Sequence, residues 1–239
     1  MVTKNQIKLV TSLQQKKYRT QHGLFVVEGK KTVNELLQAS TRLYKLFVTN
    51  VQAVQDFEGT ELVSQAELRQ MSSLNTPSDI LAVFYKPNSV EIENKDWIIA
   101  LDAVRDPGNL GTIIRLCDWF GIKHLVCSSD TVDCYNPKVL QATMGSIARV
   151  NVLYKDLSIF LKETSLPVYG AFMDGNTVHN EKLPKKGILV MGNEANGISS
   201  AVEQVISHRI SIPQFGDQTT ESLNVATATA ILLNEIRRT

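Results

Sequence analysis

Short apolar runs alternate with stretches of helical periodicity along the second half of the chain. The runs at residues 97–102 and 188–191 are almost continuously apolar, which is typical of strands covered on both faces of a parallel sheet. Strands are predicted at residues 97–102, 124–129, 152–154, 168–173, 188–191 and 210–212. Helices are predicted at residues 112–121, 136–150, 157–163 and after residue 222. This alternation predicts an α/β fold with a mostly parallel sheet.

The first part of the chain has a similar mixture on a smaller scale. Strands are predicted at residues 24–29, 43–48, 61–63 and 80–87. Helices are predicted around residues 7–13 and at residues 30–40, 51–55 and 64–71. Ser64 and Glu67 fit a helix-capping box. A polar, charged stretch follows, so we predict a small α/β domain at residues 1–88, a linker at 89–96 and a second domain at 97–239.

Three predicted strands of the second domain, at residues 97–102, 188–191 and 210–212, end in loops of small and polar residues. Ligands of open α/β sheets bind where strands end in such loops, and small residues let a ligand approach the backbone. The glycines are not followed by the Lys-Ser/Thr of a phosphate-binding P-loop, and the sequence has no GxGxxG turn after a strand. We therefore expect a nucleoside-like ligand without a triphosphate. A dinucleotide-binding oxidoreductase is disfavoured.

Five polar side chains lie in these loops and in the helices that follow them. They are Asn109, Arg115, Glu194, Ser222 and Asn224. Asn109, Ser222 and Asn224 have helix capping as their ordinary structural role. Arg115 can form a surface ion pair with Asp118, three residues further along the helix, and Glu194 can be a solvated loop carboxylate. Because parallel strands end at one edge of a sheet, a shared crevice accounts for all five positions together.

The net charge of +1 conceals a basic N-terminal region. Residues 1–50 contain nine Lys or Arg and only two acidic residues. Such a patch is typical of polyanion-binding proteins, and Tyr18 and His22 offer rings on which unpaired bases can stack. A solvated helix face is the alternative interpretation. The candidate RNA-binding residues are Lys4, Lys8, Lys16, Lys17, Arg19 and Lys30.

The composition also excludes several classes of protein. No apolar run approaches the roughly 20 residues of a membrane-spanning helix, and the N-terminus lacks a signal-peptide apolar region. We expect a soluble, cytoplasmic protein without membrane association. Cys117, Cys127 and Cys134 lack the paired spacing of zinc sites, so we expect reduced, mostly buried thiols and no metal.

Three stretches carry a more specific signal. DAVRDPGNLGTIIRLCDWFGI, LVMGNEANGIS and ISIPQFGDQTTESLNVATATAILLNEIRR resemble, in order and separation, the three motifs of the SpoU (TrmH-like) RNA 2′-O-ribose methyltransferases. The stretch QIKLVTSLQQKKYRTQHGLFVVEGKKTVNELL is similar to the small substrate-binding domain, like ribosomal protein L30e, that often precedes this catalytic domain. One departure is visible, since GDQTTE makes the loop at residues 212–221 about two residues longer than the common family pattern.

The resemblance implies a trefoil knot at the C-terminus, although knots are rare in proteins. It implies S-adenosylmethionine as cofactor and structured RNA, either rRNA or tRNA, as substrate. The cofactor-binding residues it implies are Gly192, Asn193, Gly197, Ile212, Leu223 and Asn224. It also implies a homodimer formed through the last helix. That helix is apolar on more than one face, for which a core covered from several sides is the alternative explanation.

On this resemblance, Asn109, Arg115, Glu194, Ser222 and Asn224 are the catalytic positions. A guanidinium is a poor base, so we expect Arg115 to anchor a phosphate rather than to take the ribose 2′-hydroxyl proton. The two asparagines would hold the ribose and the loops, and Glu194 would orient Arg115. A non-catalytic RNA-binding or ribosome-assembly protein on the same scaffold is the alternative, and the complete polar set favours the enzyme.

Overall fold

The computed structural model describes residues 2–50, 59–216 and 222–238. The helix expected at residues 51–55 and residues 217–221 of the long loop before Ser222 lie outside these ranges. The chain forms two compact units. The first contains Met1–Asn88 and Asp133–Ala148, and the second contains Ser89–Val132 and Arg149–Thr239.

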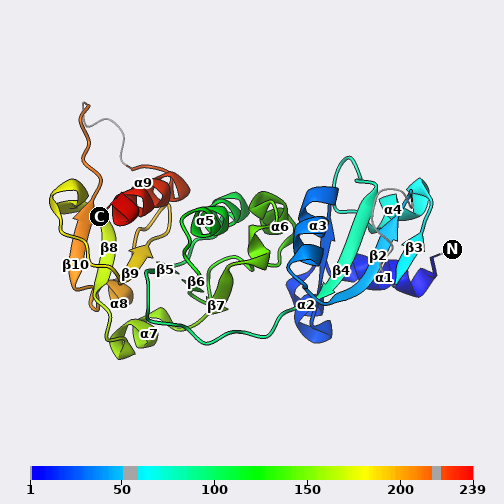
Figure 1. Cartoon of the computed structure of the whole chain (residues 1–239), viewed down its shortest axis with the longest axis horizontal. Helices are drawn as coiled ribbons and strands as arrows, with labels where there is room; N and C mark the ends of the chain where they lie inside the picture. The colour runs from blue at the N-terminus through cyan, green and yellow to red at the C-terminus, as the bar shows by residue number, and fades with distance from the viewer. Residues whose placement is uncertain (1, 51–58, 217–221, 239) are drawn as a thin grey trace. The chain divides into compact units, whose positions relative to one another are not determined.

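The first unit is built on a four-stranded sheet (Figure 1). Its strands, in spatial order, are β1 (Leu24–Glu28), β4 (Ile80–Tyr85), β2 (Leu43–Val48) and β3 (Thr60–Leu62). Strand β4 is antiparallel to both of its neighbours, and β3 is parallel to β2. The strand predicted at residues 43–48 is confirmed to the residue.

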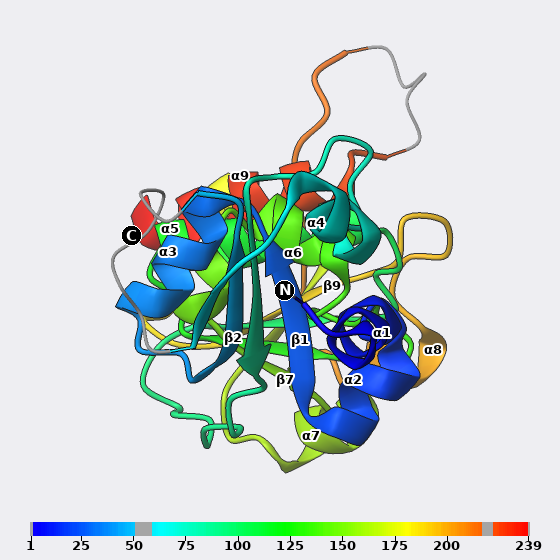
Figure 2. The ribbon, with the colours of Figure 1, turned by 90° about the vertical axis from the view of Figure 1, so that its right-hand side faces the viewer.

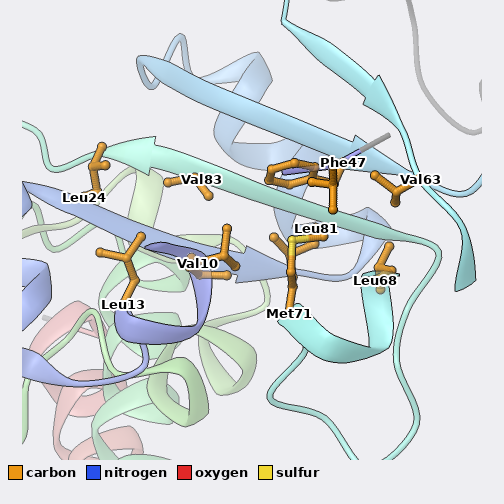
Figure 3. Packing of buried hydrophobic residues seen from close by; sticks show 11 residues of the cluster. Val10, Leu13, Leu24, Phe47, Val63, Leu68, Met71, Leu81 and Val83 are labelled. Carbon is orange, nitrogen blue, oxygen red and sulfur yellow. The ribbon is translucent and has the colours of Figure 1, made fainter. Parts of the chain in front are cut away.

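Helices cover both faces of this sheet. They are α1 (Lys4–Ser12), α2 (Lys16–His22), α3 (Lys30–Gln38) and α4 (Gln65–Met71). Figure 2 shows α1 and α3 on opposite sides of the sheet. Figure 3 shows Val10 of α1, Leu13 directly after it and Leu68 of α4 packed against residues of the sheet. The predicted capping box is confirmed, because Ser64 Oγ accepts from Glu67 N–H and the Glu67 carboxylate accepts from Ser64 N–H.

A segment from later in the chain completes the first unit. Helix α6 (Pro137–Thr143) packs against β1, and the 3₁₀ turn η2 (Ser146–Ala148) packs against α3. The single helix predicted at residues 136–150 is wrong, because Met144 and Gly145 both have positive φ and end α6. This segment therefore belongs to the first unit, whereas the sequence grouped it with the rest of residues 97–239.

The second unit contains a six-stranded sheet in which all neighbouring strands are parallel. Its strands, in spatial order, are β10 (His208–Ser211), β8 (Val168–Thr177), β9 (Ile188–Met191), β5 (Ile98–Leu101), β6 (His124–Cys127) and β7 (Asn151–Tyr154). Strands β5 and β9, at the centre, are fully buried, as their continuous apolar sequences predicted.

The helices of the second unit lie on the two faces of its sheet. They are α5 (Pro107–Trp119), α7 (Leu157–Glu163), α8 (Ser200–Glu203) and α9 (Val225–Arg238), with a 3₁₀ turn η3 (Val178–Asn180). Helices α7 and α8 pack together over one apolar face, and α5 packs along α9 (Figure 1). Ala226 and Leu233 of α9 are buried within the chain, which supports a core covered from several sides. Among the described residues, no helix has the length and apolarity to cross a membrane.

Candidate active site

Three loops meet at the carboxyl-terminal edge of the parallel sheet. They follow β5, β9 and β10, and their described residues are 102–106, 192–199, 212–216 and 222–224. Hydrogen bonds between side chains join these loops. These bonds bring together three of the five candidate side chains, Asn109, Glu194 and Asn224.

Asn109 lies at the centre of this network. Asp106, not Asn109, caps α5, because the Asp106 carboxylate accepts from the Asn109 N–H at 2.7 Å. The capping role considered for Asn109 is therefore wrong, and its side chain is free to reach other loops. Its amide Nδ2 donates to Glu194 Oε1 at 2.6 Å, and its Oδ1 accepts from Asn224 Nδ2 at 2.9 Å.

Asn224 combines a structural role with a place in the site. Its Oδ1 accepts from the N–H groups of Ala226 and Thr227, which caps α9 as predicted. This cap fixes the direction in which the Nδ2 group points toward Asn109. Ser222 is exposed, and its side chain forms no hydrogen bond with any residue that the structure describes.

The loop after β9 is held closed by Asn193. The Asn193 side chain donates to the carbonyl of Ala103 at 2.7 Å and accepts from the N–H groups of Ala195 and Asn196. Its backbone forms two hydrogen bonds with Gly197 at 2.9 Å. The loop thus forms a tight turn that is attached to the loop after β5.

The glycines of this loop are required by its own geometry. A Cβ atom on Gly192 would collide with the Gly197 carbonyl carbon and the Ile198 nitrogen. Gly197 has a φ of 67°, which is the left-handed conformation that glycine adopts without strain. Gly192 therefore serves the close approach of two backbone segments.

Asp102 was not identified from the sequence. Its side chain is buried, at 6% exposure, and its Oδ2 accepts from the N–H of Ser199 at 2.7 Å. This bond connects the end of β5 to the start of α8. The sequence signal that could have identified Asp102 is its position directly after a continuous apolar strand. A carboxylate at such a buried position needs a hydrogen-bond partner.

Arg115 is exposed and has no ion pair within the described chain. The surface pair considered between Arg115 and Asp118 is absent, because Asp118 pairs with Arg149 at 2.8 Å. The expectation that Glu194 orients Arg115 is also wrong. The Glu194 carboxylate accepts from the side-chain amides of Asn109 and Asn193.

The arginines of the second unit fall into two groups. Those that pair with acidic side chains are Arg149, Arg209, Arg237 and Arg238. Arg105 and Arg115 are exposed and form no ion pair with any residue in the described ranges. The backbone beside Arg105 is fixed, since the Val104 carbonyl accepts from Val132 N–H at 3.0 Å. Arg105, which the sequence analysis did not identify, is thus a second cation without an ion pair in the described ranges, and it lies just before α5.

The remaining cofactor candidates present apolar surface. Ile212, directly after β10, is half-buried, and Leu223 is 48% exposed beside Asn224. Apolar side chains next to amide groups and backbone N–H donors suit a purine nucleoside, whose flat ring is apolar and whose edges are polar.

The basic candidates of the first unit separate into two kinds. Lys4, Lys8, Lys16, Lys17 and Lys30 are exposed. Arg19, in contrast, is 2% exposed and donates from Nε and Nη2 to Asp133 Oδ2 at 2.9 and 2.5 Å. Its Nη1 donates to the carbonyls of Leu13 and Gln14. The RNA-binding prediction for Arg19 is therefore wrong, because its guanidinium is buried and donates its hydrogen bonds to groups inside the first unit.

The three cysteines lie in the interior of the chain. Cys117, Cys127 and Cys134 are buried thiols, as predicted. Burial raises the pKa of the Cys117 thiol, so that group stays protonated. No cluster of three metal-ligating side chains occurs among the described residues.

Comparison with known proteins extends these observations. A family model described as the SpoU rRNA methylase family matches residues 96–234, and the MRM3-like substrate binding domain matches residues 4–82. The 23S rRNA (guanosine(2553)-2′-O)-methyltransferase RlmP of Bacillus subtilis is 31% identical over 98% of this chain and 97% of its own length. The mitochondrial rRNA methyltransferase 3 of Xenopus laevis is 30% identical over a match that covers 61% of this chain and 38% of that protein.

Solved structures give the same result. A structure from Porphyromonas gingivalis, assigned to the TrmH family of RNA methyltransferases, is 39% identical with a TM-score of 0.92 over the whole of both chains. An rRNA methyltransferase from Sinorhizobium meliloti with bound AdoMet is 27% identical, with a TM-score of 0.88 over 100% of this chain and 96% of that one.

Fold and site together define an α/β protein with a network of polar side chains at the carboxyl edge of a parallel sheet. The chain belongs to the SpoU rRNA methylase family. The resemblance read from the three sequence motifs is thereby confirmed.

Proposed function

We propose that this protein transfers the methyl group of S-adenosylmethionine to a ribose 2′-hydroxyl of ribosomal RNA. The main support is the hydrogen-bonded chain from Asn224 through Asn109 to Glu194, which joins the three motif loops into one polar site. Family membership and the rRNA methyltransferases among the relatives favour this reaction and favour rRNA over tRNA. The relative RlmP, which acts on 23S rRNA, points to the large-subunit RNA.

S-adenosylmethionine fits the residues at this edge of the sheet. We assign the adenosine to the apolar surface at Ile212 and Leu223, with the backbone of the loop at residues 192–197 beside it. The AdoMet-bound relative supports this cofactor. A C-terminal trefoil knot is part of the proposal, and the family motifs support it.

The cofactor supplies an activated methyl group on a sulfonium, so the protein's tasks are alignment and proton removal. We assign Arg115 to a phosphate next to the target ribose, because its guanidinium is exposed and forms no ion pair with the carboxylates that the structure describes. Asn109 and Asn224 align the ribose and the loops, and Glu194 holds the Asn109 amide. We assign the exposed Ser222, two residues before Asn224, to contact with the substrate. The ribose proton passes to water or to a neighbouring side chain.

The first unit is proposed to bind the RNA. Its exposed lysines at positions 4, 8, 16, 17 and 30 provide positive charge for phosphates, and the match to the MRM3-like substrate binding domain supports this role. We also propose that this unit is L30e-like, as its sequence suggested.

A homodimer is proposed for the complete protein. Trp119, at the end of α5, is 85% exposed, although large apolar side chains are usually covered. A second copy docking over the end of α5 and the adjacent α9 would cover it. Action on rRNA favours a cytoplasmic location.

The test is methyl transfer by the purified protein. It is incubated with tritiated S-adenosylmethionine and unmodified large-subunit rRNA, and the labelled nucleotide is mapped by ribose-methylation sequencing. Transfer to one ribose supports the proposal. Tight rRNA binding without transfer would instead support the non-catalytic assembly protein. Total RNA from cells lacking the gene should lack the same methyl group.

A further inference from the structure

We propose that Tyr44, Arg42 and Tyr85 of the first unit form a stacking site for an unpaired base of the RNA. This proposal rests on RNA being the substrate, as argued above. The three residues come from the start of β2 and the end of β4, which are adjacent strands. The Tyr85 N–H donates to the Arg42 carbonyl at 2.9 Å, so the backbone holds the residues together.

The side chains form a layered cluster. The Arg42 guanidinium carbon lies 4.2 Å from the centre of the Tyr85 ring, which is a cation–π arrangement. The Tyr44 ring meets the Tyr85 ring edge-on, with centroids 5.7 Å apart and planes at 80°. Arg42 and Tyr44 thus both contact the Tyr85 ring and order the cluster.

The three side chains differ in how deeply they are buried. Tyr85 is partly buried and packs against the apolar core under α1 and α4. Tyr44 is 44% exposed, Arg42 is exposed, and neither belongs to that core. The register of β2 shifts between Leu43 and Lys45, so Tyr44 stands at a bulge, a feature that re-aims a side chain. The Tyr44 ring therefore lies on the surface and is supported by Tyr85, which is anchored in the apolar core.

The local charge favours nucleic acid. Arg42 has no ion pair within the described ranges, whereas the neighbouring Lys45 is paired with Glu61 at 3.1 Å. Arginine planes and tyrosine rings are the groups on which splayed-out RNA bases stack. A guanidinium that has no carboxylate partner in the described ranges and lies next to an exposed tyrosine can bind a base and its phosphate together, which neither group does alone.

The choice of ligand follows from the same geometry. A double-stranded RNA segment presents stacked bases that a protein ring cannot reach. The cluster is small, with one tyrosine presented, so it suits one unpaired nucleotide of a loop or bulge. It would help to select the substrate without touching the reacting ribose.

The experiment measures RNA binding by the full-length protein. The probes are an rRNA fragment and an unstructured RNA oligonucleotide with 2-aminopurine in place of one adenine, whose fluorescence is quenched on stacking. Tyr44→Ala should weaken binding about 10-fold and remove the quenching, whereas Tyr44→Phe should keep both, because a base stacks on either ring. Arg42→Gln should weaken binding and reduce its salt dependence.

Two controls guard against a change in the fold. Leu62→Ala removes apolar surface from the same sheet, at a side chain that is 56% exposed, and should leave binding unchanged. Tyr44→Leu keeps the apolar volume without the aromatic face and should behave like Tyr44→Ala. Unchanged binding and quenching in folded Tyr44→Ala and Tyr44→Leu would overturn the proposal. Methyl transfer is scored separately: if it is absent while binding depends on Tyr44, the methylase assignment fails and the stacking site stands.

Discussion

The side-chain amide of Asn109 donates to the carboxylate of Glu194 at 2.6 Å, although the two residues are 85 positions apart in the chain. The bond joins the first turn of α5 to the loop after β9. Because the same Asn109 side chain also accepts from Asn224, a single residue sets the distances among all three loops. Function should therefore be sensitive to this position.

Asn109→Asp should lower methyl transfer about 100-fold, since it places a second carboxylate against Glu194 and drives the loops apart. The rate is measured under single-turnover conditions with saturating cofactor. Asn196→Asp is the matched control: Asn196 is an exposed asparagine of the loop after β9, which also carries Glu194, and its change should have little effect. Equal rates for the two variants would contradict the role given to Asn109.

Arg115→Ala should abolish methyl transfer and leave S-adenosylmethionine binding nearly intact, because the guanidinium is assigned to the RNA phosphate. Calorimetry with the cofactor and a transfer assay separate these two effects. Arg149→Ala removes an exposed arginine that is already paired with Asp118, so it should retain activity. Full activity of Arg115→Ala would remove Arg115 from the reaction.

Asp133→Ala should destabilise the first unit by about 3–5 kcal/mol, because it leaves the buried Arg19 guanidinium without its carboxylate. Urea unfolding followed by the fluorescence of the folded protein gives this free energy. Asp118→Ala breaks an exposed pair and should cost at most about 1 kcal/mol. Similar losses in both variants would show that burial does not distinguish the two pairs.

Gly192→Ala should destabilise the second unit by about 1–3 kcal/mol and weaken S-adenosylmethionine binding, because the new methyl group collides with the backbone of Gly197 and Ile198. Thermal unfolding and cofactor titration measure the two effects. Gly216→Ala adds the same methyl group where no atom of the described residues lies within 4 Å, so its stability should change by less than about 0.5 kcal/mol.

The stability of the second unit should fall as the pH drops below the ordinary pKa of histidine. Burial lowers the pKa of His124, whose Nε2 accepts from the Glu93 N–H at 3.2 Å and is therefore unprotonated. The unfolded chain then binds a proton at a higher pH than the folded one. The contribution is complete above about pH 6.5 and is lost as the pH falls toward the lowered pKa. Urea midpoints of the wild type and His124→Gln should converge at low pH.

Local patterns in the sequence were sufficient to predict most of the described helices and strands. The strands at Leu43–Val48 and Ile188–Met191 and the helix at Leu157–Glu163 have the predicted bounds, because their apolar spacing is set within a few residues. Helix α6 was predicted too long, since the left-handed conformation of Met144 depends on the packing of the following turn. Strand β8 was predicted too short, because its last residues pair with β10, which is distant in sequence.

The site could be predicted as a set of positions but not as a set of contacts. Motif order placed Asn109, Glu194 and Asn224 at one sheet edge. The sequence could not show that Glu194 binds amides instead of Arg115, or that Asp118 pairs with Arg149. For the same reason, Arg19 looked like a surface cation in a basic stretch, while its partner lies 114 residues away. Such pairings arise only when the chain is folded.

The return of Asp133–Ala148 to the first unit means that neither unit is one continuous piece of chain. A protease that cuts within residues 89–96 would sever a peptide bond without freeing either product. The severed N-terminal fragment would stay attached through the Arg19–Asp133 pair and the contacts of α6 with β1 until denaturant is added. Native gels of the nicked protein should show one band, and denaturing gels should show two.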